Sequence, residues 1–514
     1  MKNKIALFLA VLFLNTAKSQ TLSVDFSNTD TVSNMIGFLH AMDATNPHDS
    51  LIVPLSPGYW RAGGLTTTIY NRATTTIGAK FMIAVSDLYG YPPGWTPPYS
   101  DTTGFKTFVD NLCASTASIP IIYDIWNEPN GTYWSGLDSL FFQTFKMAHD
   151  RIRFNLGTSV QICGPSIVNA DTAYIRAFCN YCLANNVQLD ILSFHWFYND
   201  SIMPYFDDAL LWCRNNFINN PTYAPLQIKK IVINEIVNET GQYKPAFNLA
   251  HFYYLEKGKA NGACKACWNA NDSSGTETCF NNTLNGILTP TTNLKRAVYW
   301  AFKRYAELDS IRYLTNSSNP RVFSITGNLK SNPNTVRMMI GYYHNTTPLA
   351  PTSVSITLNN LNPLPDFPAS DSIKINLYKI PNTEFNQLVQ PTFLGQYTYA
   401  NNTPSIILST LLLDTNAVVY ADIVSTSATV GLSDLNKEKN KLIVFPNPTQ
   451  QSLSIQLPGQ YFDVSIYDNF GREIVNHKKA FDKIVLDCSQ FPNGIYFLKT
   501  TSAKTTYTEK FIKN

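Results

Sequence analysis

The chain has 514 residues, of which 44% are hydrophobic, 13% aromatic and only 15% charged. This length exceeds what one hydrophobic core can organise, so we expect two or three domains. The 39 Lys and Arg residues nearly balance the 36 Asp and Glu residues. Because no long basic run could neutralise a stretch of phosphates, the composition argues against nucleic acid as a partner.

The N-terminal residues 1–19 have the order of a secretory signal peptide. Two lysines precede an apolar run from Ile5 to Leu14, and the small-residue sequence Ala-Lys-Ser follows at 17–19. This run is too short to span a bilayer, and no later stretch reaches about 18 apolar residues. We therefore expect an exported protein with no transmembrane segment.

The region from Gly37 to Leu308 alternates short apolar runs with longer amphipathic stretches, the pattern of repeated βα units. The predicted strands end near His40, Arg61, Asp87, Glu128, Pro165, His195, Glu235 and Trp268. A doubly wound open sheet alternates in the same way, but no Gly-rich phosphate loop follows the first strand, and eight units favour closure. We predict an α/β fold in which residues 20–310 form a (β/α)8 TIM barrel.

The sequence after Leu308 changes to strand-like alternation. Segments such as Arg337–Tyr343 and Ile373–Tyr378 alternate in polarity and are separated by Asn- and Pro-rich turns. We predict a β-sandwich at residues 311–427, a polar linker at 428–441 and a small all-β domain at 442–514.

The last predicted domain contains three motifs in a fixed order: Pro-Asn-Pro at 446–448, Phe-Gly-Arg at 470–472 and Pro-Asn-Gly-Ile-Tyr-Phe-Leu-Lys at 492–499. These segments closely resemble the C-terminal sorting domain of proteins exported by the type IX secretion system of Bacteroidota. The resemblance implies that residues 442–514 engage the export machinery and are removed after passage through the outer membrane. It also implies that the protein is secreted or lies at the cell surface.

Two glutamates stand at the predicted tips of strands four and seven. Glu128 ends an apolar strand that stops at Pro129, and Glu235 ends a second apolar strand. They are 235 − 128 = 107 residues apart, or three βα units of about 36 residues each. Cleavage of a glycosidic bond through a covalent intermediate needs one carboxyl group that protonates the leaving oxygen and one that attacks the anomeric carbon. The spacing predicts that both face one barrel mouth.

The Trp-Asn-Glu-Pro motif at 126–129, combined with a glutamate on strand seven, resembles the large clan of retaining (β/α)8 glycosidases. His195 on strand six and Arg61 on strand two add to the likeness. Within this clan the sequence is most similar to glycoside hydrolase family 39, the β-xylosidase and α-L-iduronidase group, whose members also pair the barrel with a β-sandwich. The likeness extends loosely over residues 30–425.

This resemblance implies a role for three residues. Glu128 would be the general acid/base, Glu235 the nucleophile and Asn127 the donor to the sugar 2-hydroxyl. An acid must stay protonated near neutral pH, so we expect partial burial and the charge of Glu235 to raise the pKa of Glu128. Glu235 should stay ionised through hydrogen bonds.

His195, Tyr198 and Arg61 are further candidates for substrate binding. His195 and Tyr198 could bind sugar hydroxyls or orient a glutamate, although a histidine at a strand end can also be purely structural. Arg61 could hold Glu235 ionised or contact the substrate, and it could equally form a structural ion pair.

Trp268, at the tip of strand eight, is a candidate sugar-stacking platform, although a core role is the alternative. His40 and Asp87 end strands one and three and could each contact a sugar hydroxyl. Glu239 is the rival nucleophile, but it follows its strand by several residues, and the need for accurate positioning favours Glu235.

The nine cysteines are an odd number, so at least one is free or pairs outside the chain. Cys179-x-x-Cys182 and Cys264-x-x-Cys267 resemble halves of a zinc site, but they lie too far apart in the sequence for a zinc ribbon. We favour buried thiols, or one local disulfide such as Cys264 with Cys279, and we expect no metal and no cofactor.

The sequence therefore predicts a secreted, retaining glycosidase that is exo-acting and xylosidase-like, with plant or glycosaminoglycan-type oligosaccharides as substrates. An endo-acting glycanase of the same clan is the first alternative, because fold and catalytic pair would be shared. A closed pocket would favour exo action and an open groove endo action. The second alternative is a non-catalytic carbohydrate-binding surface protein, against which the presence of both glutamates and Asn127 argues.

Overall fold

The computed structural model describes residues 20–272, 275–344, 349–426, 442–502 and 506–514. The chain forms two compact units, Met1–Ser425 and Thr426–Asn514, and each is described by itself. The predicted signal peptide at 1–19 and the predicted linker at 428–441 lie outside the described residues.

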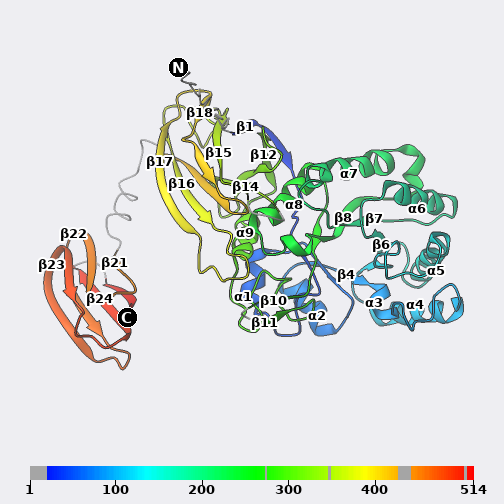
Figure 1. The fold of residues 1–514 in the computed structure, drawn as a ribbon, viewed down its shortest axis with the longest axis horizontal. Coiled ribbons are helices and arrows are strands. Elements are labelled where there is room, and N and C mark those ends of the chain that lie inside the picture. The colour runs from blue at the N-terminus through cyan, green and yellow to red at the C-terminus, as the bar shows by residue number, and fades with distance from the viewer. Residues whose placement is uncertain (1–19, 273–274, 345–348, 427–441, 503–505) are drawn as a thin grey trace, which may run out of the picture. The chain divides into compact units, whose positions relative to one another are not determined.

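The larger unit contains a closed barrel of eight parallel strands, which confirms the predicted (β/α)8 fold (Figure 1). In barrel order the strands are β2 (Gly37–Leu39), β3 (Tyr59–Ala62), β4 (Lys80–Ala84), β5 (Ile122–Asp124), β6 (Gln161–Ile167), β7 (Ile191–Trp196), β8 (Lys230–Ile236) and β9 (Ala263–Lys265). Pairing of Phe38 in β2 with Lys265 in β9 closes the ring.

Helices in the connections between strands surround this barrel, as crossovers between parallel strands require. They are α1 (Asp49–Ile52), α2 (Thr67–Asn71), α3 (Val85–Tyr89), α4 (Thr102–Thr116), α5 (Asp138–Leu156), α6 (Thr172–Ala184), α7 (Phe206–Cys213), α8 (Pro245–Lys257) and α9 (Ala297–Ala306). Shorter helical turns are η1 (Val53–Leu55), η2 (Arg72–Thr76), η3 (Met203–Tyr205), η4 (Arg214–Ile218), η5 (Pro221–Leu226) and η6 (Glu239–Gly241). A small hairpin, β10 (Ala270–Asp272) and β11 (Gly275–Glu277), follows the last barrel strand.

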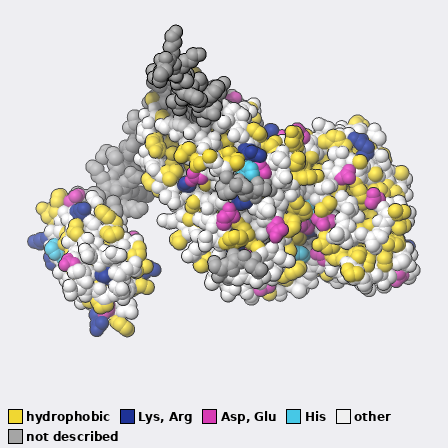
Figure 2. Space-filling view, in the orientation of Figure 1, with side chains coloured by type: hydrophobic (Ala, Val, Ile, Leu, Met, Phe, Trp, Pro, Cys, Tyr) yellow, Lys and Arg dark blue, Asp and Glu magenta, His cyan; other side chains and the backbone are white. Residues whose placement is uncertain are grey.

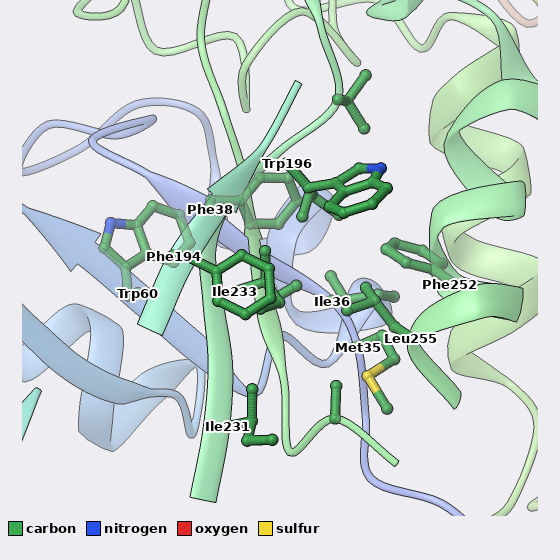
Figure 3. Packing of buried hydrophobic residues seen from close by; sticks show 14 of the residues in the cluster. Met35, Ile36, Phe38, Trp60, Phe194, Trp196, Ile231, Ile233, Phe252 and Leu255 are labelled. Atoms are coloured by element: carbon green, nitrogen blue, oxygen red, sulfur yellow. The ribbon is translucent and has the colours of Figure 1, made fainter. Parts of the chain in front are cut away.

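The barrel strands are buried on both faces, as expected for a parallel sheet that helices cover. One buried layer takes one side chain from each of seven strands: Tyr59, Met82, Ile122, Cys163, Ile191, Val232 and Cys264. The alternate side chains, such as Trp60, Ile231 and Ile233, belong to the core between strands and helices, where Phe252 and Leu255 of α8 pack toward them (Figure 3). Because neighbours along a strand point to opposite faces, Arg61 points to the same side as Tyr59, into the barrel.

The β-sandwich of the larger unit consists of two sheets. One has the order β12 (Ile311–Ser317), β1 (Gln20–Thr31), β15 (Thr352–Asn359) and β18 (Ser405–Ile407), and β19 (Leu411–Leu413) also pairs with β15. The other has the order β13 (Val322–Leu329), β14 (Asn332–Tyr342), β20 (Val418–Thr426), β16 (Ser372–Ile380) and β17 (Thr392–Ala400). These strands confirm the predicted all-β region.

The strand β1 corrects one predicted boundary. The sequence predicts a barrel that starts at residue 20. In the structure β1 instead lies between β12 and β15, and it buries Leu22, Val24 and Phe26 in the core of the sandwich. The first barrel strand begins only at Gly37. The sandwich is therefore built from both ends of the larger unit, which ties it to the barrel.

A buried ion pair also joins the sandwich to the barrel. Glu256 of α8 accepts hydrogen bonds from Arg312 of β12 at 2.9 Å and from Tyr305 of α9 at 2.8 Å. Because all three side chains are buried, this contact fixes the sandwich against the outer helices of the barrel.

The smaller unit is all-β, as predicted. Its strands are β21 (Ile443–Phe445), β22 (Ser452–Tyr467), β23 (Glu473–Asp487), β24 (Gly494–Ser502) and β25 (Thr506–Lys513). They form one sheet in the order β21-β22-β24-β25, with β23 also paired to β22. A separate apolar core that includes Leu453, Val464 and Phe511 holds this unit together.

The predicted disulfide has a different partner in the structure. Cys279 is bonded to Cys267, not to Cys264. Cys264 lies within β9 and contributes to the buried layer of the barrel, whereas Cys267 comes after the strand, where the chain has turned toward the loop that carries Cys279. Cys264 is therefore enclosed in the barrel, and Cys267 is the cysteine that reaches Cys279.

One side of the larger unit carries no strongly charged patch among its described residues. On the side of the larger unit drawn in Figure 2, acidic and basic side chains are scattered among apolar and neutral polar ones. Among the helices of the described residues, none combines the length and apolar character needed to cross a membrane.

Candidate active site

A cavity of about 650 Å³ opens at the C-terminal ends of the barrel strands. Its lining residues are Leu39, His40, Arg61, Gly63, Gly64, Asp87, Tyr91, Asn127, Glu128, Tyr133, Val168, Phe197, Glu235, Cys267, Trp268, Cys279 and Phe280. In a (β/α)8 barrel this end is where the loops after the strands gather functional side chains. The two predicted carboxyl groups, Glu128 and Glu235, are therefore lining residues of one cavity.

Arg61 is the charged centre of this site. Its Nη1 donates to Glu235 Oε1 at 2.6 Å, its Nη2 to Asn127 Oδ1 at 2.9 Å and its Nε to Asp124 Oδ2 at 2.7 Å. Only 1% of Arg61 is exposed. Burial alone would lower the pKa of this guanidinium, but the carboxylates of Asp124 and Glu235 outweigh that effect, and the net pKa lies above its ordinary value. Arg61 therefore remains a cation that holds three site residues in place.

Asp124 anchors a polar network beneath the cavity that sequence reasoning missed. Its carboxylate accepts from Ser166 at 2.6 Å and from the amide of Asn234 at 2.8 Å, in addition to Arg61. Ser166 is also paired with Ser193 at 2.7 Å. All of these side chains are buried. A signal was present, because a charged residue in the apolar strand Ile121–Ile125 must be paired if it is buried.

Glu128 is held by its backbone as well as by its side chain. Its φ of 47° lies in the left-handed region, which is uncommon for a residue other than glycine. Its backbone N–H donates to Ser166 O at 2.9 Å, and its carbonyl accepts from Gly131 N at 2.9 Å. The neighbouring Asn127 donates its backbone N–H to Ser86 Oγ at 2.9 Å. This unusual turn after β5 directs Glu128 over the barrel instead of along the strand.

His195 lies between the two glutamates and is fully buried. Its Nδ1 is 2.8 Å from Glu128 Oε1, and its Nε2 is 3.8 Å from Glu235 Oε1. The two carboxyl groups thus approach opposite nitrogens of a single imidazole ring. This geometry brings together the residues predicted from strands four, six and seven.

The ionisation of these groups follows from their burial. Burial raises the pKa of Glu128 to about 7, although the charge of Arg61 acts in the opposite direction. Burial also raises the pKa of Glu235, while His195 and Arg61 oppose that rise. Burial lowers the pKa of His195 to about 4, so this imidazole is neutral near pH 7. At neutral pH the site can therefore hold a protonated Glu128 beside a carboxylate that is paired with Arg61.

His40 and Asp87 lie together on another part of the cavity wall, although Asp87, predicted at the end of strand three, lies in α3 after β4 has ended at Ala84. His40 Nε2 is 3.8 Å from Asp87 Oδ2, and Asp87 accepts a hydrogen bond from Tyr91. Burial, followed by the charge of Arg61, lowers the pKa of His40 to about 4. Burial raises the pKa of Asp87. Because the lowered pKa keeps the His40 imidazole neutral near pH 7, this pair offers hydrogen-bonding groups without a positive charge.

Aromatic side chains form two parts of the wall. Trp268 and Phe197 contact each other edge to face at 5.1 Å, and Trp268 Nε1 donates to Val237 O at 2.9 Å. Tyr133 and Tyr91 contact each other at 4.8 Å. Phe280, the fifth aromatic residue of the lining, is 74% exposed. Of these, sequence reasoning found only Trp268.

Two residues that the sequence brought into consideration lie elsewhere. Tyr198 is half-buried but absent from the cavity lining, because its ring packs on Trp196 at 4.7 Å, and the preceding residue Phe197 lines the cavity instead. Glu239 is exposed in the turn η6 and does not line the cavity. Within the described ranges, no group of three or more His, Cys, Asp or Glu side chains is arranged to hold a metal ion.

Comparison with protein families gives two matches within the chain. Residues 118–205 match the family described as glycosyl hydrolases family 39. This segment contains Asn127, Glu128 and His195 but ends before Glu235. Residues 443–514 match the secretion system C-terminal sorting domain, and they coincide with the strands of the smaller unit.

Three solved structures are similar in fold to the larger unit. N2152 from Neocallimastix frontalis has a TM-score of 0.64 at 19% identity, over 79% of this chain and 100% of that one. A glucosidase from Croceicoccus marinus has a TM-score of 0.55 at 13% identity, over 80% and 100% of the two chains. The GH39 enzyme from Xanthomonas axonopodis pv. citri has a TM-score of 0.54 at 11% identity, over 79% and 98%.

The family match lies on the barrel segment that carries Glu128 and His195, and the match to the sorting domain covers the smaller unit. A carbohydrate substrate and the secretion machinery are the partners that these matches imply. These matches identify a glycosidase whose (β/α)8 barrel contains a segment similar to family 39, and the C-terminal sorting domain marks the chain for export by the type IX system of Bacteroidota to the cell surface or the medium.

Proposed function

We propose that the protein is a retaining glycosidase that works by double displacement, with Glu128 as general acid/base and Glu235 as nucleophile. The observation that supports this most strongly is the position of both carboxyl groups on opposite nitrogens of His195, at 2.8 and 3.8 Å. A retaining mechanism requires its two carboxyl groups about 5–5.5 Å apart, without room for a water between them. Both carboxyl groups reach one imidazole and line one cavity, so they face the same small volume, in which a sugar can bind.

The positions of the protons favour Glu128 as the acid/base and Glu235 as the nucleophile over the opposite assignment. With the pKa of Glu128 raised to about 7, its protonated carboxyl can donate to Nδ1 of the neutral His195. The remaining ring proton then lies on Nε2, which faces Glu235. The direct ion pair of Glu235 with Arg61 favours the carboxylate form that a nucleophile needs. Glu128 has no such cation in contact.

In the first step, Glu128 transfers its proton to the leaving oxygen while a Glu235 oxygen attacks the anomeric carbon and the glycosidic bond breaks. Esterification removes the charge of Glu235, which lowers the pKa of Glu128 and lets its carboxylate act as a base. In the second step, Glu128 takes a proton from water, and the resulting oxygen attacks the anomeric carbon and releases Glu235.

The remaining site residues bind or position groups for these steps. Since Asn127 Oδ1 accepts from Arg61, its Nδ2 is the donor suited to a sugar 2-hydroxyl. His195 and Arg61 act as positioning residues for the two glutamates. His40 can bind a hydroxyl through its ring nitrogens, and Trp268 offers a flat face for a sugar ring.

We further propose exo action on the ends of oligosaccharides, with a xylosidase-like preference among plant or glycosaminoglycan-type chains. The cavity supports this, because the loop that contains Cys267, Cys279 and Phe280 contributes to its wall. The fold is also similar to that of a glucosidase and of a GH39 enzyme. An endo-glycanase would instead need an open groove through the site.

The test uses a panel of 4-nitrophenyl glycosides that begins with the β-xyloside. We expect the wild type to release nitrophenol from at least one member, and Glu235→Gly to lose about 10⁴-fold in kcat. Azide added to Glu235→Gly should restore release and form a glycosyl azide of inverted configuration, which identifies both nucleophile and sugar. Glu239→Gly is the matched control and should stay close to the wild type.

Two results would contradict the proposal. Azide rescue of Glu239→Gly instead of Glu235→Gly would move the nucleophile to the exposed turn. No release by the folded wild type from any glycoside or polysaccharide would favour the non-catalytic carbohydrate-binding alternative.

A further inference from the structure

The chain segment 278–282, which we call the Phe280 turn, forms an unusual part of the cavity wall. It follows the hairpin after barrel strand β9, and the disulfide from Cys279 to Cys267 ties its start back to the end of that strand. Both cysteines line the cavity, as does Phe280. A large apolar side chain that is 74% exposed gains little for stability where it stands. What distinguishes Phe280 from other exposed apolar residues is its place in the wall of the cavity.

The Phe280 turn reaches from the end of β9 across to the loop after β2, the first barrel strand. The Phe280 ring contacts the His40 ring at a centroid distance of 4.8 Å. Asn282 donates to Asp43 Oδ2 at 2.6 Å. Asp43 is itself fixed, since its Oδ1 accepts from the backbone N–H groups of Thr45 and Asn46. The turn is thus attached at both sides of the point where the barrel closes.

A buried ion pair supports the turn from below. Glu277, directly before the turn, is 1% exposed and accepts from Arg296 at 3.2 Å and from Thr283 directly after it. Arg296 is completely buried and also donates to the carbonyls of Gly286 and Leu288. Because removing one partner of a buried pair is costly, these contacts hold the turn in one position. The disulfide and the ion pair together make a fixed wall.

The position of the general acid decides which end of the substrate meets this wall. Glu128 must face the leaving oxygen, and Tyr133 belongs to the same loop, in which Gly131 N donates to Glu128 O at 2.9 Å. The leaving group therefore lies on the side of Tyr133, after strand four. In a barrel of eight strands the eighth strand, here β9, lies opposite the fourth, here β5. The Phe280 turn consequently faces the sugar whose anomeric carbon is attacked.

We propose that the Phe280 turn walls off the glycone end of the cavity, and that Phe280 is the residue that restricts cleavage to the terminal sugar. This inference rests on the proposed glycosidase function and deepens it. A second sugar attached to the non-reducing side of the bound residue would have to pass through the volume of the Phe280 and His40 rings. The chain therefore enters from the Tyr133 side only.

The experiment compares two substrates of the full-length protein, 4-nitrophenyl β-xyloside and 4-nitrophenyl β-xylobioside, or the corresponding pair for the sugar that the wild type cleaves best. Release of an intact disaccharide, detected by mass spectrometry, reports cleavage with a sugar beyond the wall. We expect Phe280→Ala to raise kcat/KM for disaccharide release, relative to that for the monosaccharide, about tenfold. Phe280→Trp should restore a ratio close to that of the wild type.

Phe154→Ala is the matched control, because Phe154 is 76% exposed at the end of α5 and does not line the cavity. It should leave the ratio unchanged. If Phe280→Ala turns over the monosaccharide glycoside normally and its ratio of disaccharide to monosaccharide release is unchanged, the proposal that Phe280 blocks a second sugar is wrong, while the proposed function stays intact. Disaccharide release by the wild type at a rate similar to that of the monosaccharide would also overturn the proposal about Phe280.

A second measurement needs no turnover. The difference in acrylamide quenching between a protein and its Trp268→Phe version isolates the contribution of Trp268, which lines the same cavity. If the turn walls the cavity, Phe280→Ala should make Trp268 about twofold more accessible to quencher, whereas Phe154→Ala should not. Equal quenching in the wild type and Phe280→Ala would contradict the wall even if no glycoside were cleaved.

Discussion

A cavity lies beside the N-terminal ends of β4, β5 and β6, and another opens at the C-terminal ends of the barrel strands, but the two differ in the groups that line them. The cavity at the N-terminal ends of the strands measures about 800 Å³, and none of its lining residues is Asp or Glu. The smaller one at the C-terminal ends, about 650 Å³, is lined by Asp87, Glu128 and Glu235 together with Arg61. Volume therefore does not distinguish the site, whereas concentrated buried charge does.

The difference arises within single strands. Lys80 is exposed at the start of β4, and Lys230 at the start of β8 is half-buried, so both can keep their charge in contact with water. The residues near the C-terminal ends, such as Arg61 and Asp124, are completely enclosed and satisfy one another. Keeping charges buried costs stability unless each has a partner. What this network visibly does is hold Glu235 and Asn127 in place through Arg61.

The largest effect is expected from breaking the charge network at its centre. Arg61→Met leaves Asp124 buried without a cation and removes the partner of Glu235, so unfolding in urea should show a loss of about 3–5 kcal/mol. Turnover of the best 4-nitrophenyl glycoside should fall at least about 100-fold, because two site residues lose their support. Arg151→Met, which removes a more exposed pair with Asp110, should cost far less stability, because solvent screens that pair. If Arg61→Met is as stable as the wild type, the buried network is not the feature that separates the two ends.

The meeting of the two candidate carboxyl groups at one cavity was predictable because its signals are local. Apolar runs that are followed by Glu128 and Glu235 can be recognised in isolation, and barrel topology then brings the ends of the strands together whatever their separation in the sequence. The turn that redirects Glu128 and the bridge through His195 depend on side-chain geometry, which spacing does not determine. Tyr198 shows how little spacing says about single side chains, because its neighbour Phe197 lines the cavity and Tyr198 does not.

Other features depend on long-range pairing and left no local signal. The alternation in β1 fits any half-buried strand, and only its pairing with β15, in which Gln20 lies opposite Val354, assigns it to the sandwich. The choice of Cys267 over Cys264 depends on where β9 ends. Phe280 is a single exposed aromatic residue in a polar segment and becomes notable only beside His40.

A smaller effect, dependent on pH, is expected from Glu128→Gln. The pKa of Glu128 is raised from 4.5 to about 7 in the folded protein, so the folded state binds more protons between these values and stability falls as pH rises through this range. Below about pH 4.5 the wild type and variant should be equally stable, and at pH 8 the variant should gain up to about 3 kcal/mol. Urea unfolding at both pH values measures this difference.

The same variant should change the pH profile of activity. In the wild type, kcat/KM should decline above about pH 7 as the acid ionises, and Glu128→Gln should lack this alkaline limb on substrates with activated leaving groups. Glu239→Gln, at an exposed carboxyl group, should alter neither stability nor profile. An equal stability gap between variant and wild type at pH 4.5 and pH 8 would show that Glu128 does not carry the raised pKa.

The smallest effect is expected from filling the larger cavity. Ser118 is exposed on its rim, so Ser118→Trp can occupy this volume without disturbing a packed core, and kcat and KM should stay within about twofold of the wild type. The matched substitution is Gly64→Trp at the other end, where a Cβ would meet nothing within 4 Å and the residue lines the smaller cavity. That indole should raise KM about tenfold or more by occupying substrate volume, with little change in unfolding. If Ser118→Trp impairs turnover as strongly as Gly64→Trp does, then the N-terminal cavity contributes to function, and the charged end of the barrel cannot be the whole of the site.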